Sequence, residues 1–133
     1  MKNKWHGMGI AVLVLVIMVV GYGFRCNQSE DTTSGSSVDV SAPSSLTATI
    51  TSGNIMVTWQ DNSDNETIFC LYAKSYSASS WTLYSNVIPA NATSYSFPSY
   101  DLASSGNFQF CLTAYDGNDG VESAASNIVS LSW

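Results

Sequence analysis

Apolar and polar residues alternate along this chain from Pro43 onward, and this period of two constrains the fold more than any other feature. In the stretch IMVTW, for example, Ile55, Val57 and Trp59 share one face while the residues between them share the other. Side chains alternate in this way across a β-strand, whereas a helix requires a period of 3.6 residues. The alternation therefore predicts strands with one buried face.

Seven segments carry this pattern, and turn residues separate them: 46–50, 55–59, 68–74, 81–84, 93–97, 107–115 and 127–131. Many short strands at such spacing are typical of an all-β sandwich. The residues on their inward faces are large and often aromatic, so a domain of this size can bury a stable core without a metal. The predicted core contains Trp59, Phe69, Leu71, Phe108, Phe110 and Leu112.

The N-terminus predicts a membrane-spanning helix. Twenty uncharged residues separate Lys4 from Arg25, and a helix of that length spans about 30 Å, the thickness of the membrane hydrocarbon. Lysines precede the span and an acidic chain follows it, which places the N-terminus in the cytoplasm and the remainder outside. Residues 1–26 are thus predicted to be a cytoplasmic tip and one apolar helix, marked by Trp5, Ile10, Val20 and Phe24.

Two other interpretations of this segment stay open. Its most apolar part is short enough to be the core of a cleaved signal peptide, in which case the protein is secreted. Lipidation at Cys26 is the third, although Arg25 stands where a lipidation site needs a small residue. All three interpretations place the rest of the chain outside the cytoplasm. The state of Cys26 stays open: its thiol is free, acylated or in a disulfide with another chain.

Charge is scarce and one-sided in the remainder of the chain. Only 11% of residues are charged, and all ten carboxylates follow Arg25, where Lys74 is the single basic residue. This balance excludes nucleic acid, whose phosphates require a basic surface. Residues 27–41, rich in Ser, Thr and Asp, are predicted to be a flexible polar linker to a domain over residues 42–133.

The segments APSSLTATI, WQDNSDNETIF and DLASSGNFQFCLTAYDGNDGVESAASNIVSLSW resemble a fibronectin type III domain of the kind common in bacterial extracellular proteins. The resemblance covers residues 43–133 and implies a seven-stranded immunoglobulin-like sandwich. Leu102 stands six residues before Phe108, as the leucine of the family stands before its corner tyrosine, and so joins the predicted core. Phe108 itself departs from the family, because it lacks the hydroxyl of that tyrosine.

The family topology implies that the acidic loops meet at one pole of the sandwich. Carboxylates of this kind suit calcium, but Asn and Asp also form turns through their own side chains. We expect turns and no metal, with a cation site as the alternative; the carboxylates concerned are Asp61, Asp64, Glu66, Asp116 and Asp119.

Cys70 and Cys111 occupy outward positions on strands that the family topology makes neighbours. Directly opposed residues of an antiparallel pair come within disulfide range, whereas a register shift of two leaves them apart. In an oxidising compartment we expect a disulfide between them. Tyr72 and Tyr115, outward on the same strands, are a possible binding face.

Catalysis finds no support in the sequence. The single histidine is His6, before the predicted span, so no serine or cysteine of the domain has an imidazole to activate it. We expect no cofactor and no enzyme, but a membrane-anchored extracytoplasmic protein with a binding, adhesion or spacer role toward another envelope or extracellular protein or a glycan. Two alternatives remain: a filament subunit, since HGMGIAVLVLVIMVV resembles the helix region of archaeal-type pilins, or a secreted accessory module for a glycan-acting system.

Overall fold

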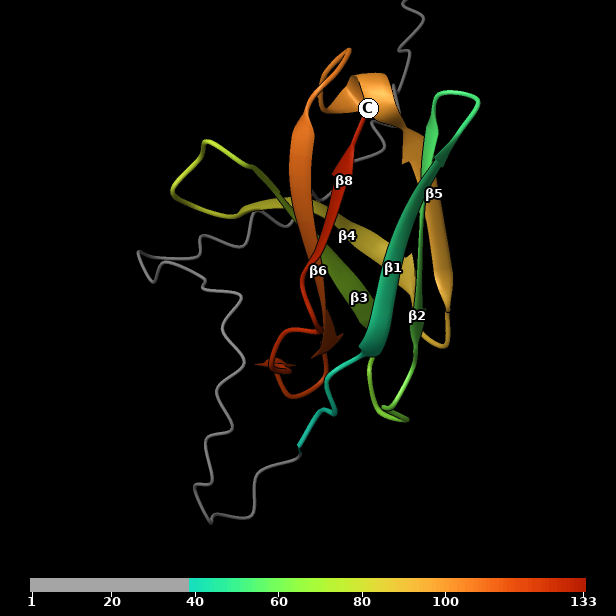
Figure 1. Cartoon of the computed structure of the whole chain (residues 1–133). Helices are drawn as coiled ribbons and strands as arrows, with labels where there is room; N and C mark the ends of the chain where they lie inside the picture. The colour runs from blue at the N-terminus through green and yellow to red at the C-terminus, as the bar shows by residue number, and fades with distance from the viewer. Residues whose placement is uncertain (1–38) are drawn as a thin grey trace, which may run out of the picture.

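The computed structural model describes residues 39–133, which form a sandwich of two antiparallel sheets (Figure 1). The first sheet has the order β1-β2-β5, with β1 at Ser44–Thr51, β2 at Asn54–Gln60 and β5 at Ser94–Pro98. The second has the order β4-β3-β6-β7, and β8 also pairs with β6. Its strands are Ile68–Ser75 (β3), Thr82–Pro89 (β4), Asn107–Asp116 (β6), Val121–Glu122 (β7) and Val129–Ser132 (β8).

The all-β class predicted from the sequence is confirmed, and a short 3-10 helix, η1 (Ser99–Asp101), is the one helical element within residues 39–133. The last predicted strand differs, because β7 and β8 both pair with β6 and are separated by residues 123–128. None of the helices in the described part is long and apolar enough to cross a membrane. The predicted N-terminal helix lies outside the described residues.

Serine side chains explain why the last strand is divided. The Ser123 and Ser126 hydroxyls accept hydrogen bonds from the backbone N–H groups of Ala114 (2.9 Å) and Leu112 (3.0 Å). The backbone N–H groups of the same two serines donate to the carbonyls of Ala114 and Leu112, each at 2.8 Å. Hydroxyl oxygens thus replace main-chain carbonyls along β6, and its buried backbone groups stay paired without regular strand geometry.

The core lies between the sheets and follows the alternation in the sequence. Ile55, Val57 and Phe69 are fully buried, and aromatic rings connect the two sheets. The Phe97 ring, from β5, lies 6.1 Å from the Phe110 ring of β6, centroid to centroid. Trp59 packs edge-on against Phe69 at 5.4 Å. Leu71 and Leu112 are also buried, while Leu102 and Phe108 are half-buried against the core.

The two ends of the sandwich differ in composition. At one end lie the connections 61–67, 90–93 and 117–120, together with the first described residue, Asp39; we call this end the acidic pole. At the other end lie the connections 52–53, 76–81 and 99–106 and the C-terminus (Figure 1). We call this end the groove pole, because residues of β3, β4 and the connection 99–106 line a groove there. Chain and strand order therefore place the start of the domain at the acidic pole.

Candidate functional site

Two aspartates of the acidic pole act as acceptors within their own turns. Asp61 Oδ1 accepts a hydrogen bond from the Ser63 backbone N–H at 3.0 Å. Asp116 Oδ1 accepts one from the Asn118 N–H at 2.8 Å, and Gly120, at φ 70°, closes the same turn. These are the contacts by which aspartate shapes a loop.

The five carboxylates named from the sequence do not converge. Asp64 and Asp119 are exposed, and the part of the chain described holds no group of three or more acidic, cysteine or histidine side chains that could bind a metal. Asp61 and Glu66 do lie near each other. Burial raises the pKa of Asp61, and the Glu66 carboxylate raises it further against the opposing hydrogen bond from Ser63.

The loop from Asp61 to Glu66 also holds the first residues of the domain. Asn62 Nδ2 donates to the Ala42 carbonyl and to Ser44 Oγ, both at 2.9 Å. Glu66, only 6% exposed, accepts the Asn91 backbone N–H at its Oε1 at 2.9 Å. The loop is thereby tied both to the start of β1 and to the turn between β4 and β5.

The predicted disulfide between Cys70 and Cys111 is wrong. In the pairing of β3 with β6, Cys70 lies opposite Thr113, and Tyr72 lies opposite Cys111. The two cysteines are therefore offset by two residues, which is too far for a disulfide across directly opposed positions. Cys70 is a buried free thiol, and burial, together with the charge of Glu122, raises its pKa to about 11.

The structure places the two tyrosines of the possible binding face, Tyr72 and Tyr115, in buried and half-buried positions. Tyr72 is 8% exposed, and Tyr115 is half-buried beside it in a second cluster on the outer face of the sheet. The Tyr72 hydroxyl donates to Glu122 Oε1 at 2.8 Å, and Thr113 Oγ1 donates to the same oxygen at 2.6 Å. Burial and this carboxylate both raise the pKa of Tyr72. These tyrosines hold β3, β6 and β7 together and offer little surface to a partner.

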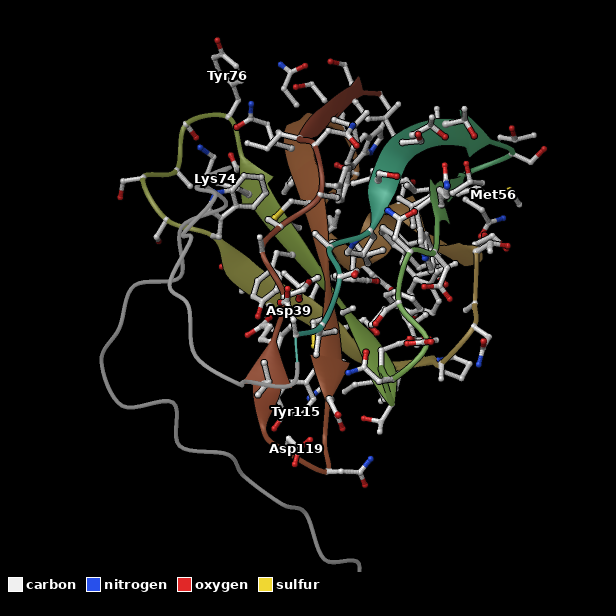
Figure 2. All side chains as sticks on the ribbon, turned by 90° about the horizontal axis from the view of Figure 1, so that it is seen from below. Asp39, Met56, Lys74, Tyr76, Tyr115 and Asp119 are labelled. Carbon is white, nitrogen blue, oxygen red and sulfur yellow. The ribbon has the colours of Figure 1, made fainter. Side chains whose placement is uncertain are left out.

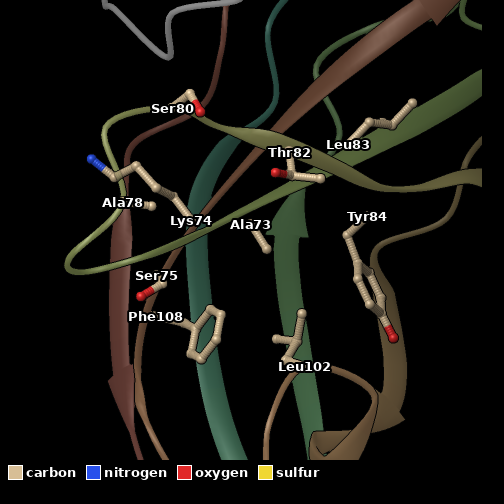
Figure 3. Close-up of a pocket in the computed structure, with 10 residues that line it drawn as sticks. All are labelled: Ala73, Lys74, Ser75, Ala78, Ser80, Thr82, Leu83, Tyr84, Leu102 and Phe108. Carbon is tan, nitrogen blue, oxygen red and sulfur yellow. The ribbon is translucent and has the colours of Figure 1, made fainter.

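A groove opens at the groove pole, and Figure 3 shows the side chains that line it. Its volume is about 330 Å³. Apolar side chains and a tyrosine line one part of it, while hydroxyls and one lysine line the rest. The lining residues are Ala73, Lys74, Ser75, Ala78, Ser80, Thr82, Leu83, Tyr84, Leu102 and Phe108.

Aromatic contacts shape the groove and its surroundings. The Phe108 ring stacks on Trp133, with centroids 5.2 Å apart and an interplanar angle of 21°. The Tyr84 hydroxyl donates to Asp101 Oδ2 at 3.2 Å, and burial and this carboxylate raise the pKa of Tyr84 to about 12. The Lys74 ammonium lies 5.2 Å from the centroid of the Trp81 ring, a cation–π distance.

A second hollow of about 290 Å³ adjoins the groove and shares Phe108 with it. Tyr76 lines this hollow and is 74% exposed. Lys74 and Tyr76 lie at the side of the molecule far from Asp119 (Figure 2). The groove pole thus combines exposed aromatic surface with hydroxyl groups and one carboxylate, Asp101, whereas the acidic pole carries most of the carboxylates of the described residues.

The sequence did not predict the groove, because its lining comes from three separated segments that meet only in the fold. One local signal was present: residues 75–84 combine four serines with two tyrosines and a tryptophan. The burial of Glu66 was also missed, since nothing in the alternation distinguishes it from the exposed Asp64 beside it.

No family model and no curated protein sequence matches the chain. Solved structures do match it. An Fn3-like protein from Clostridium thermocellum is 19% identical with a TM-score of 0.56, and the match covers 69% of this chain and 91% of that one. The FN3 domain of human collagen XX is 14% identical with a TM-score of 0.56, covering 76% of this chain and 100% of that one.

A larger protein also contains a similar domain. The β-1,2-glucanase from Parabacteroides distasonis is 18% identical with a TM-score of 0.57, but the match covers 71% of this chain and only 13% of that one. The likeness therefore concerns one part of that enzyme. The sheet order, the core and these matches together show that residues 39–133 have the fibronectin type III fold.

Proposed function

We propose that this chain is a membrane-anchored extracytoplasmic protein whose fibronectin type III domain is a non-catalytic binding module. Residues 1–26 would anchor it, with the N-terminus in the cytoplasm. The fold supports a binding or spacer role, and the sequence of residues 39–133 contains no histidine to serve as a general base.

The position of the groove carries this proposal. Asp39, where the described domain begins, lies at the acidic pole, bonded through its carbonyl to Asn65 Nδ2 at 3.5 Å. The groove, whose lining residues Figure 3 shows, lies at the opposite pole, among the connections 76–81 and 99–106 (Figure 1). A domain tethered through its first residues is therefore attached at the pole opposite the groove, which leaves the groove free to contact a ligand.

We propose a carbohydrate as the ligand class. Tyr76 and Tyr84 offer flat apolar surface, and Ser75, Ser80 and Thr82 offer hydroxyls that donate and accept hydrogen bonds. That combination of an apolar lining and a few polar groups suits a sugar ring. Lys74 adds one positive charge, so a sugar carboxylate is also accommodated. The similar domain within a β-1,2-glucanase is a further, weaker support.

Two matched variants test the groove. Tyr76 and Tyr100 are each 74% exposed, but Tyr76 lines the hollow beside the groove while Tyr100 lies on η1 and lines neither hollow. We expect the full chain in detergent to bind immobilised glucan or galacturonan, and Y76A to weaken that binding at least about tenfold, the scale of an aromatic contact residue. Y100A should bind like the wild type. Equal loss in both variants, or no binding to either polysaccharide, would exclude a carbohydrate site here.

The anchor is tested separately by the N-terminus of the mature protein. An intact Met1 in the membrane fraction supports the anchored protein. A start at Met8 or Ile10 instead supports the filament subunit, and a start near Phe24 supports secretion. N-terminal sequencing of native material distinguishes these results directly.

A further inference from the structure

One buried carboxylate oxygen at the acidic pole has no hydrogen-bond partner. Three buried side-chain atoms of the described residues lack one, namely Trp59 Nε1, Ser85 Oγ and Glu66 Oε2. Of these, only Glu66 Oε2 belongs to an acidic side chain, and Glu66 is 6% exposed. Burying a carboxylate without a compensating partner is costly, so such a group is normally paired or coordinates a cation.

No side chain of the domain can neutralise this carboxylate. Lys74 is the single Lys or Arg in residues 39–133, and it lies at the other pole with its ammonium over Trp81. The neighbouring ionisable group is instead a second carboxyl, Asp61, which lies within hydrogen-bond reach of Glu66 and adds negative charge to the same place. Two adjacent carboxylates with no positive side chain among the described residues are stabilised either by a shared proton or by an external cation.

We propose that Asp61 and Glu66 bind a hard divalent cation of the calcium class at the acidic pole. Calcium takes six to eight oxygen ligands from carboxylates, amide side chains, backbone carbonyls and water. The loop is rich in these donors, because Asn62, Ser63, Asp64 and Asn65 lie between the two carboxylates. The unpartnered Glu66 oxygen distinguishes this pair from the other acidic side chains of the same pole.

A cation here would act on the junction between the domain and the chain that precedes it. The loop already holds Ala42 and Ser44 through Asn62, and the Asp39 carbonyl through Asn65. Ordering the loop around a cation therefore stiffens the first residues of the domain. This inference is independent of the groove and of the ligand proposed for it.

The test is thermal unfolding of the full chain at pH 7.5, after treatment with a chelator, in calcium chloride and in sodium chloride of equal ionic strength. We expect millimolar calcium to raise the Tm by at least about 4 °C, as a ligand that binds the native state does. Calcium should also slow proteolysis between Asp39 and Ser44. D61N and E66Q should lose both effects, and D119N, altered in an exposed aspartate of the neighbouring loop, should keep them.

Four results would overturn the proposal. The first is a Tm unchanged by calcium, and the second is an equal rise in sodium chloride, which means charge screening alone. The third is a calcium response that D61N retains. The fourth is a protein stabilised by acidification and not by calcium, which means that the two carboxylates share a proton. If E66Q does not fold, D61N still decides, because Asp61 is only partly buried.

Discussion

Cys70 lies opposite Thr113 in the antiparallel pair of β3 and β6, two residues out of register with Cys111. Its thiol is buried, with the pKa raised to about 11. Because thiolate is the reactive form, we expect Cys70 to resist iodoacetamide in the native protein at pH 8 and to react after unfolding without reductant. Peptide mass spectrometry checks this, and a Cys70–Cys111 cross-linked peptide would contradict the register.

Alkaline pH should destabilise the domain through the same thiol. Its pKa rises from an ordinary 9.0 to about 11 in the folded state, so the unfolded chain releases this proton first as the pH rises. The stabilisation is complete below pH 9 and is lost as the pH rises to about 11. We expect the Tm of C70A to fall less than the Tm of the wild type when the pH is raised from 9 to about 11. Identical losses would show that Cys70 contributes nothing to the alkaline transition.

The Ser126 hydroxyl should contribute more to the free energy of unfolding than a serine in a strand pattern, ordinarily an outward residue, is expected to. It is 3% exposed and accepts the Leu112 N–H at 3.0 Å. S126A leaves that buried donor unpaired, which costs about 1–3 kcal/mol. Denaturant unfolding measures the loss. S130A, on the exposed side of β8, should stay within about 0.5 kcal/mol of the wild type, and an equally small effect in S126A would contradict the proposed pairing.

Gly106 should be intolerant of a side chain because of Phe108. A Cβ at Gly106 would lie 2.8 Å from Phe108 Cε2, so G106A must displace the ring that stacks on Trp133. Overpacking of this kind costs about 1–3 kcal/mol in the free energy of unfolding. The control is the double variant G106A/F108L, in which the smaller side chain relieves the clash. Its destabilisation should be at least about 0.5 kcal/mol below the sum of the single variants; additive losses would contradict the contact.

The alternation in the sequence was sufficient for the strands and most of the core, because burial of one face is a local property of each strand. Ile55, Val57 and Trp59 are buried as their spacing requires. The divided last strand was not predictable in this way. It depends on the hydroxyls of Ser123 and Ser126, which accept hydrogen bonds from backbone N–H groups of β6. A serine in a strand pattern is ordinarily an outward residue, so nothing in the sequence indicated this role.

The sites were less predictable because they depend on register and on contacts between distant segments. A shift of two residues leaves the inward and outward faces of β3 and β6 unchanged, so the pattern could not distinguish Thr113 from Cys111 as the neighbour of Cys70. The outward position of Tyr72 was correctly placed on the strand. Its hydroxyl pairs with Glu122 of β7, an element absent from the predicted set, so this contact was not predictable.

Hydrogen–deuterium exchange of the full chain, with and without bound polysaccharide, tests the central claim most directly. If the groove is the binding surface, the ligand should slow exchange in peptides covering residues 74–84 and 102–108. Peptides covering residues 61–66 and 117–120, at the acidic pole, should exchange as before. Protection confined to the acidic pole, or no protection at saturating ligand, would contradict the assignment of the groove pole as the surface presented to a partner.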